Sequence, residues 1–384
     1  MKMKKVAILT FFNRMNYGAD LQAYALHKKV KDLGYDCEIL DVLAPNDPCA
    51  KRPQIYKPLA SSQKMQSIKN RINKKIVTFM AKILGTKNAQ LKKEKFEQFK
   101  KMYMAVSERK FASVDDLYCH QMLYDIFITG SDQVWSPKSA FTSPEPYFLT
   151  FVSKDKKKIS YAPSFGVSEI PQEVKEHYKQ WLTNIDFLSV RENQGAEMVR
   201  NIAGRIAEVV LDPTLLLTAD EWNQIAVEPK IKKPYILLYD RINSSYVVKL
   251  AYHLSKKTGC SIVRIPRGNS REGIEYKIKN LFDIGPSDFL GLFHNASFVL
   301  TSSFHGTAFA INYNKPFYSI LRKGYLVNSR IINILDNLRL ASRLLYVGDS
   351  FPNDDYFVNF SQANVSLHKE REKSLAFLTN ALEI

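Results

Sequence analysis

The residues best suited to chemistry lie at positions 297–316, with the sequence SFVLTSSFHGTAFAINYNKP. Residues 298–300 form an apolar, β-prone run, which predicts a buried strand. The small polar residues after this run suit a helix N-cap, and a helix is predicted over 307–312. His305 is therefore expected in a tight turn between a strand and a helix.

A histidine in such a turn can move protons, because the ordinary pKa of imidazole, about 6.5, lies near neutrality. The unpaired N–H groups at the start of a helix also attract phosphate and carboxylate groups. The predicted anion-binding residues surround this helix start and are Ser302, Ser303, Gly306 and Thr307. A capping or packing role for His305 is the alternative.

Alternating strands and helices must position this turn. Residues 5–10 predict a buried strand, the Asn-Tyr-Gly-Ala turn at 16–19 leads into a helix, and residues 37–42 predict a second strand. Open α/β sheets bind ligands at the carboxyl ends of such strands. A third strand runs into Gly-Ser-Asp-Gln at 130–133, and a fresh series of strands and helices begins at Lys233. The sequence therefore predicts an α/β fold with two doubly wound, Rossmann-like domains that face a cleft.

Five segments occur in order along the chain: NYGADLQAYAL from Asn16, GSDQVW from Gly130, SVRE from Ser189, LDPTLLL from Leu211 and SFHGTAFAINYNKPF from Ser303. Together they resemble the polysaccharide pyruvyl transferase family, from about residue 4 to about residue 321. The resemblance implies an enzyme that moves the pyruvyl group of phosphoenolpyruvate onto two hydroxyls of one sugar, forming a cyclic ketal and releasing phosphate. The acceptor is expected to be a capsule, exopolysaccharide or other surface-glycan precursor, often lipid-linked.

The resemblance also implies a GT-B-like arrangement of domains. The N-terminal domain is expected at 1–217 with a basic helical insertion at about 51–110, and it is the acceptor side. The C-terminal domain, with the donor site, is expected at 233–345. A helix at 365–384 is expected to cross back to the first domain.

Two residues match the catalytic positions that the resemblance implies. His305 is the proton-handling residue, and Arg191, at the end of the predicted strand 187–192, is expected to clamp the carboxylate or phosphate of the donor. The alternative for Arg191 is an ion pair with Glu192 or with an acid at the domain interface. Arg241 is also assigned to the donor side, only because it lies at the end of a predicted strand.

Ser303 marks a departure from the family pattern. Many members carry Arg-Leu-His-Gly where this chain has Ser-Phe-His-Gly at 303–306, although the latter also looks like a recurring version within the family. A serine cannot form the bidentate ion pair that arginine makes with an oxyanion. Another cation must therefore compensate, or donor binding differs.

The loops of the N-terminal domain supply the predicted acceptor site, because short polar groups and a nearby aromatic ring typically bind sugar hydroxyls. The predicted acceptor-binding residues are Asn16, Tyr17, Gly18, Asp20, Ser131, Asp132 and Gln133. An N-cap is the alternative for Asp132. Asp212, which precedes a proline, is expected to shape the link between the domains.

The net charge of +17 on the 384-residue chain belongs mainly to one segment. Residues 51–110 hold 17 Lys or Arg and three acids, so they carry +14 and the rest of the chain about +3. Two helices separated near Gly85 are predicted there, and the first, at 64–83, is basic and amphipathic. Such a helix either packs on its own domain or lies on an anionic membrane surface. No nucleic-acid-binding motif accompanies the charge, so a nucleic-acid partner is not expected.

The remaining composition excludes other classes of protein. A hydrophobic content of 45% with 12% aromatic residues is typical of a packed globular chain. Neither a membrane span nor a signal peptide is predicted, which places the protein in the cytoplasm. If the helix at 64–83 lies on a membrane rather than packing on its own domain, the contact is peripheral and at the inner face. The cysteines at 37, 49, 119 and 260 lack metal-ligand spacing, so no metal and no cofactor is expected beyond the donor substrate.

Two other functions stay open. A GT-B-type glycosyltransferase that uses a nucleotide sugar would need an acid for the base and ribose in the C-terminal domain, and none stands out near His305. A catalytically silent glycan-binding relative is suggested only by Ser303.

Overall fold

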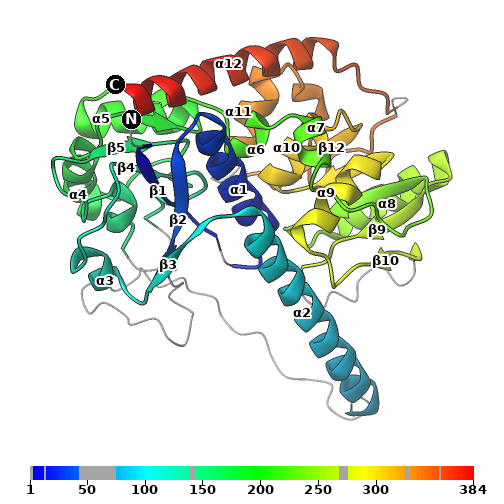
Figure 1. Ribbon diagram of the computed structural model, residues 1–384. Coiled ribbons are helices and arrows are strands. Elements are labelled where there is room, and N and C mark those ends of the chain that lie inside the picture. Colours follow the sequence, from blue (N-terminus) through cyan, green and yellow to red (C-terminus); the bar gives the residue numbers. More distant parts are fainter. Residues whose placement is uncertain are drawn as a thin grey trace.

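A computed structural model describes residues 3–12, 14–42, 75–137, 143–267, 276–324, 329–353 and 356–384, with backbone only at 75–86 and 114. Two parallel β-sheets, each flanked by helices, lie on either side of the molecule (Figure 1). We call them, with their helices, the N-terminal half and the C-terminal half. The prediction of an α/β fold with two doubly wound units is confirmed.

The sheet of the N-terminal half has five parallel strands in the order β3-β2-β1-β4-β5. Its strands are β1 (Lys5–Leu9), β2 (Asp36–Val42), β3 (Val106–Phe111), β4 (Ile126–Thr129) and β5 (Lys157–Ser160). A parallel pair, β6 (Ser189–Val190) and β7 (Glu208–Val209), follows. The helices of this half are α1 (Tyr17–Asp32), α2 (Lys75–Tyr103), α3 (Val114–Tyr118), α4 (Gln172–Thr183) and α5 (Asn193–Ala203).

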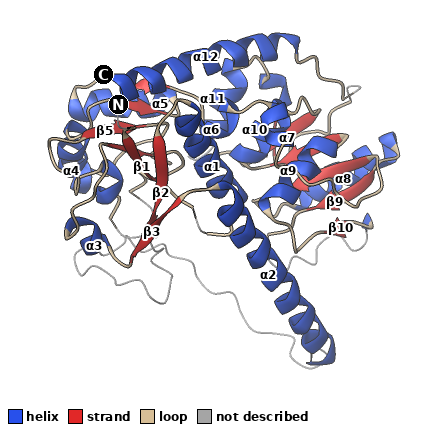
Figure 2. Ribbon diagram, viewed as in Figure 1, coloured by secondary structure: helices blue, strands red, loops and turns tan. Residues whose placement is uncertain are grey.

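The sheet of the C-terminal half has six parallel strands in the order β10-β9-β8-β11-β12-β13. These strands are β8 (Tyr235–Tyr239), β9 (Ser261–Arg264), β10 (Lys279–Asn280), β11 (Phe298–Thr301), β12 (Phe317–Leu321) and β13 (Leu344–Tyr346). The helices around them are α8 (Ser245–Thr258), α9 (Pro286–Asn295), α10 (Phe304–Asn312) and α11 (Ser329–Asn337). Two short helices, α6 (Pro213–Leu216) and α7 (Ala219–Asn223), precede β8 and lie between the halves (Figure 2).

The last helix, α12 (Ser361–Glu383), runs from the C-terminal half back across the N-terminal half (Figure 1). Arg371 Nε donates to Leu215 O at 2.6 Å, and Leu211 N donates to Ser374 Oγ at 2.9 Å. Near the end of α12, Lys157 Nζ from β5 donates to Leu382 O at 2.9 Å. Residues 365–383 of the helix expected at 365–384 therefore belong to α12.

Two local predictions are wrong. His305 does not lie in a turn, because α10 begins at Phe304 and includes the histidine in its first turn. No break occurs near Gly85 either, since α2 runs without interruption through it. The predicted membrane helix at 64–83 lies mostly outside the described residues, as does Cys49.

The C-terminal part of α2 packs against the other half of the protein. Lys95 Nζ forms an ion pair with Asp288 Oδ2 of α9 at 2.9 Å. The ring of Phe96 lies 5.2 Å from that of Tyr17, which stacks in turn on Phe289 of α9 at 4.7 Å. This end of the predicted insertion therefore joins the halves, where burial of aromatic surface stabilises their contact.

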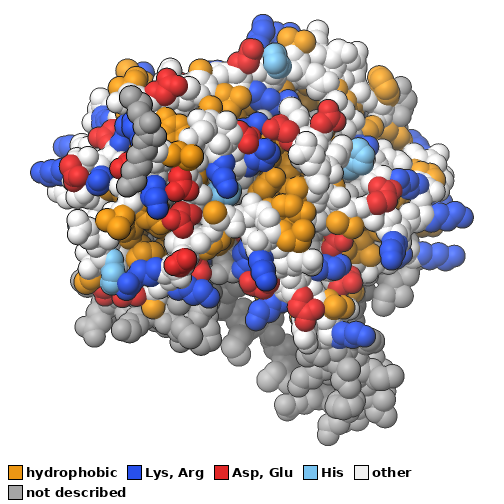
Figure 3. Space-filling view, viewed as in Figure 1, with side chains coloured by type: hydrophobic (Ala, Val, Ile, Leu, Met, Phe, Trp, Pro, Cys, Tyr) orange, Lys and Arg blue, Asp and Glu red, His pale blue; other side chains and the backbone are white. Residues whose placement is uncertain are grey.

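The charges of the described residues are mixed over the visible surface. Lys, Arg, Asp and Glu side chains alternate on the face in Figure 3 and form no broad basic patch there. Among the helices that the structure describes, each is too short or too polar to span a bilayer.

Candidate active site

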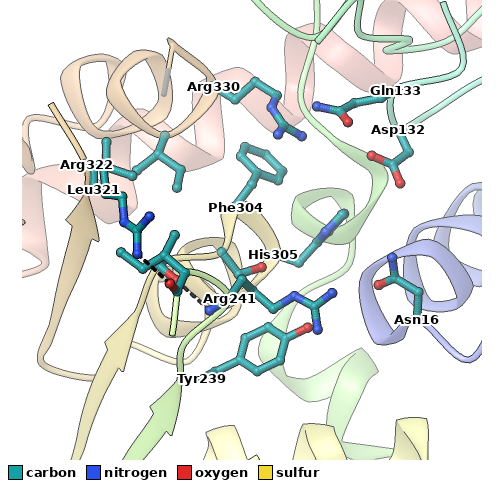
Figure 4. Close-up of a pocket in the computed structure, with 14 residues that line it drawn as sticks. Asn16, Asp132, Gln133, Tyr239, Arg241, Phe304, His305, Leu321, Arg322 and Arg330 are labelled. Atoms are coloured by element: carbon teal, nitrogen blue, oxygen red, sulfur yellow. Dashed lines mark hydrogen bonds between the residues drawn. The ribbon is translucent and has the colours of Figure 1, made fainter. Parts of the chain in front are cut away.

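A pocket of about 260 Å³ opens between the two halves. The N-terminal half contributes Asn16, Asp132 and Gln133 to its lining (Figure 4). The C-terminal half contributes residues at or just after the carboxyl ends of β8, β11 and β12, and also the start of α11. These residues are 239, 241–242, 302–305, 321–322 and 330–331. We call this space the central pocket. It lies where open parallel sheets bind their ligands.

His305 lies between the two halves in the wall of the central pocket. Its side chain is nearly buried, and Nε2 lies 3.8 Å from Oδ2 of Asp212. The opposite edge of the ring is covered by α1, because a β-carbon on Gly18 would lie 2.1 Å from Nδ1. Gly306 lets α10 approach β11 closely, since a β-carbon there would lie 2.2 Å from Oγ1 of Thr301.

Burial lowers the pKa of His305 below that of a free imidazole. Asp212 and Asp132 oppose this shift, whereas Arg191 and Arg330 add to it. The imidazole is therefore neutral at neutral pH and able to accept a proton. No hydrogen-bond partner for the buried Nε2 atom exists among the described residues.

Asp212 is the centre of a buried hydrogen-bond network beneath His305. Its Oδ2 accepts from Arg191 Nη1 at 2.7 Å and from Ser131 Oγ at 3.1 Å. Its Oδ1 accepts from the backbone N and Oγ1 of Thr214 at 3.0 and 2.7 Å. Burial alone would raise the pKa of Asp212, but His305 when it is protonated, Arg191 and the Thr214 hydrogen bonds lower it, so the carboxylate is ionised. Asp212 also caps α6, at the link between the halves where it was expected. Its contact with the site was not predicted from the sequence.

Arg191 is buried beneath the central pocket and does not line it. Only 2% of its side chain is exposed, and Nε donates to Glu192 Oε1 at 3.1 Å. The ring of Phe304 covers it, with Cζ 4.6 Å from the ring centroid. Burial would lower the pKa of Arg191, but Glu192, Asp212 and Asp132 raise it, so the guanidinium is fully charged. The ion pairs that were the alternative for Arg191 are thus present.

The hydroxyl group of Ser302 organises the loop after β8. It donates to Asp240 Oδ1 at 2.7 Å and accepts from the backbone N of Arg241 at 2.7 Å. Arg241 is exposed and lines the central pocket. Ser302 therefore positions the Arg241 loop as well as lining the pocket.

The other predicted donor residues differ in their access to the central pocket. Ser303 lines it as the N-cap of α10, and its side chain makes no capping hydrogen bond. Thr307 Oγ1 lies 2.7 Å from Ser319 Oγ of β12 and donates to Ser303 O at 3.1 Å. Thr307 and Gly306 are buried in the packing of α10 and do not line the pocket.

The predicted acceptor residues separate into two groups. Asn16, Asp132 and Gln133 line the central pocket. Tyr17, Gly18, Asp20 and Ser131 lie behind this lining. Tyr17 donates from its hydroxyl to Ile284 O at 3.0 Å, so it holds the halves together. No helix begins at Asp132 in the described chain, which removes the N-cap alternative.

Two arginines of the central pocket were missing from the predicted site. Arg322 directly follows β12, so the strand-end rule that selected Arg241 would also have found it. Its Nη2 donates to Ile242 O at 2.8 Å. Arg330 lies at the start of α11, and no sequence pattern marked it.

The family model described as polysaccharide pyruvyl transferase matches residues 16–324. The chain belongs to the polysaccharide pyruvyl transferase family. The match includes every predicted site residue of this pyruvyl transferase family member but ends before Arg330. No functionally curated protein matches the sequence significantly.

Solved structures of GT-B proteins share the fold of this family member. UDP-GlcNAc 2-epimerase from Methanocaldococcus jannaschii is similar with a TM-score of 0.51 and 11% identity, over 96% of this chain and 99% of that one. A putative UDP-N-acetylglucosamine 2-epimerase from Listeria monocytogenes gives 0.48 and 11%, over 95% and 94%. An E. coli heptosyltransferase gives 0.41 and 10%, over 96% and 99%. At 11% identity the likeness to the Methanocaldococcus jannaschii epimerase shows the fold alone, and the predicted GT-B-like architecture is confirmed.

Proposed function

We propose that this family member is a ketal pyruvyl transferase that uses phosphoenolpyruvate as donor and a sugar with two suitably placed hydroxyls as acceptor. The observation that carries the proposal is His305, neutral and nearly buried, 3.8 Å from the ionised Asp212 at the wall of the central pocket. A neutral imidazole beside a buried carboxylate can accept a proton, because the carboxylate stabilises the imidazolium that forms.

The donor phosphate binds at the N-terminus of α10, beside Arg241. The first turn of a helix offers N–H groups and a partial positive charge to a phosphate. The side chain of Ser303 leaves this turn without a cap, and Arg241 reaches the same pocket from the loop after β8. In the proposed complex the phosphate lies at one end of the pocket and the enol carbon lies near His305.

The proposed reaction requires two proton transfers. The two hydroxyl oxygens form bonds to C2 of phosphoenolpyruvate, and the bond from C2 to the phosphate oxygen breaks. One hydroxyl proton ends on C3, which becomes a methyl group, and the other ends on the departing phosphate. The His305 imidazole accepts the proton of an attacking hydroxyl and returns it, a role that typically contributes about 10²–10⁴-fold to a rate. Arg191 acts through Asp212 and is a positioning residue.

The acceptor sugar binds on the side of the N-terminal half. Asn16, Asp132 and Gln133 bring amide and carboxylate groups from the N-terminal half to the pocket wall. Such groups can hold two hydroxyls beside the reacting carbon, and this proximity supplies much of the rate. We further propose a surface glycan, in soluble or lipid-linked form, as the source of that sugar.

Phosphate release tests the proposed function directly. The protein is incubated with phosphoenolpyruvate and a panel of sugars, and both phosphate and pyruvylated sugar are measured. Equal formation of phosphate and cyclic ketal is the expected result. Transfer from a nucleotide sugar to the same panel would instead establish a glycosyltransferase, and glycan binding without either reaction would establish a silent relative.

A further inference from the structure

Arg330 is a partly buried cation of the central pocket, and neither the sequence prediction nor the proposed reaction uses it. It lies at the start of α11 in the C-terminal half and points toward Gln133 of the N-terminal half (Figure 4). With the Gln133 amide oxygen turned toward it, Nη1 and Nη2 donate to that oxygen at 3.2 and 2.8 Å. Its Nε is buried without a hydrogen-bond partner among the described residues.

The charge of Arg330 is poorly balanced within the protein. Arg191 already has carboxylate oxygens of Asp212, Glu192 and Asp132 at 2.7, 3.1 and 3.8 Å. In the described part of the chain, Arg330 has instead the neutral amide of Gln133. Burial lowers its pKa to about 10, and the neighbouring Arg191 contributes to this shift. A partly buried guanidinium whose Nε is buried without a hydrogen-bond partner among the described residues, and which has another guanidinium nearby, is a site for an anion.

The position of Arg330 fits a ligand with two anionic ends. In Figure 4, Arg330 and Arg241 lie on opposite sides of Phe304 and His305. One cation therefore lies on each side of His305. Phosphoenolpyruvate has the same order of groups, with C2 between its phosphate and its carboxylate.

We propose that Arg330 binds the donor carboxylate while the N-terminus of α10 and Arg241 bind the phosphate. The assignment rests on the proposed function, because it names a contact within that donor site. A guanidinium matches the planar carboxylate with two parallel hydrogen bonds. Asp132, Asp212 and Glu192 reduce the positive potential at this end of the pocket, which favours the single charge of a carboxylate over the double charge of a phosphate.

This assignment supplies the cation that Ser303 cannot. Ser303 and Arg330 belong to different segments of the C-terminal half, and both line the central pocket. Gln133 fixes the plane of the guanidinium from the opposite half, so Arg330 presents its donors only when the halves are closed. Arg330 is thereby a specificity-determining residue for donors with a carboxylate on C2.

The test compares two ligands by calorimetry on the full chain. Phosphoenolpyruvate carries the carboxylate, whereas vinyl phosphate has a hydrogen in its place. Arg330→Met replaces the guanidinium with an apolar side chain and removes the charge. Arg330→Lys keeps the charge but lacks the two parallel N–H donors of the planar guanidinium. Arg339→Met, at an exposed position shortly after α11, is the matched control. Thermal unfolding of each variant without ligand verifies the fold.

Loss of a charged hydrogen-bond pair is expected to weaken phosphoenolpyruvate binding about 10- to 100-fold in Arg330→Met. Arg330→Lys should be intermediate, vinyl phosphate binding should change less than about 2-fold, and Arg339→Met should match the wild type. Equal losses for both ligands, or no loss for either, would overturn the assignment. Wild-type protein that binds no phosphoenolpyruvate would instead overturn the proposed function, so the two failures are distinguishable.

Discussion

Gly18 of α1 and His305 of α10 are in direct contact across the two halves, so that a β-carbon on Gly18 would lie 2.1 Å from Nδ1 of the imidazole. Atoms cannot approach so closely unless α1 or the His305 side chain shifts. The backbone of one half therefore sets the position of the proton-handling ring on the other. It also leaves Nε2 as the ring nitrogen that faces Asp212.

Gly18→Ala should reduce turnover strongly while the protein stays folded. Alanine favours a helix over glycine by about 1 kcal/mol, so α1 itself should not be weakened. The added methyl group must displace the imidazole or open the halves, and a misplacement of about 1 Å can lower a rate about 100-fold. Turnover and thermal unfolding measure the two effects. In a His305→Ala background the same glycine change should have no further effect on rate, and an additive loss would show that the contact does not act through the ring.

His305→Gln should lower kcat by about 10²–10⁴-fold, because glutamine keeps polarity and approximate size but cannot take up the proton. Phosphoenolpyruvate binding should change little, since its two charged ends are held by other groups. Calorimetry and single-turnover phosphate release separate these quantities. A folded variant that retains half of the wild-type rate would remove His305 from the chemistry.

Arg191→Met should destabilise the fold by about 3–5 kcal/mol, because it leaves the buried carboxylates of Asp212 and Glu192 without their cation. Denaturant unfolding gives this free energy. Arg200→Met, at an exposed position on α5, should stay within about 0.5 kcal/mol of the wild type. A loss of donor affinity with unchanged stability would instead place Arg191 in direct contact with the donor.

The acid limb of the pH profile of kcat/KM should report the pKa of His305. Burial lowers this pKa, so the limb should lie below the ordinary imidazole value of about 6.5. Asp212 raises the pKa and Arg330 lowers it. Asp212→Asn should therefore move the limb to lower pH, and Arg330→Met should move it to higher pH. Shifts in the same direction for both variants would contradict the assignment of this limb to His305.

The membrane interpretation of the basic segment leads to a prediction from charge alone. Reversal of four lysines to glutamate, at 69, 74, 75 and 82, should reduce binding to anionic vesicles by about 1 kcal/mol per residue near the surface. Activity on a soluble sugar should stay near the wild-type value. Wild-type protein that ignores anionic vesicles at low salt would leave packing on the protein itself as the role of this segment.

Several strands, and the place of His305 between one of them and the following helix, could be predicted because they depend on neighbouring residues. Short apolar runs predicted β8 and β11, which are buried along their whole length. The network around Asp212 could not be predicted in this way. Its hydrogen bonds reach 21 residues back to Arg191 and 81 back to Ser131, so only the fold brings these groups together. The start of α10 was placed too late because Phe304 was expected to precede the helix, whereas it occupies the first helical position.

The contribution of Arg330 depends on the same kind of long-range contact. Arg330 reaches Gln133 of the other half, and no local pattern around either residue predicts the pair. Arg322 differs, since it directly follows a buried strand and could have been included on that ground. Arg241 and Arg322 thus follow strand ends that the sequence can predict. Arg330 reaches the central pocket only through the tertiary structure.

The path of α12 restricts how the central pocket can open. The chain passes between the halves at α6 and α7 and again before α12, which Arg371 and Ser374 fasten to residues 211–215. One connection would leave the halves free to swivel in any direction. Two connections reduce this freedom to rotation about the line that joins them. Each cycle of substrate entry and product release should therefore return Gly18 to the same place on the ring of His305.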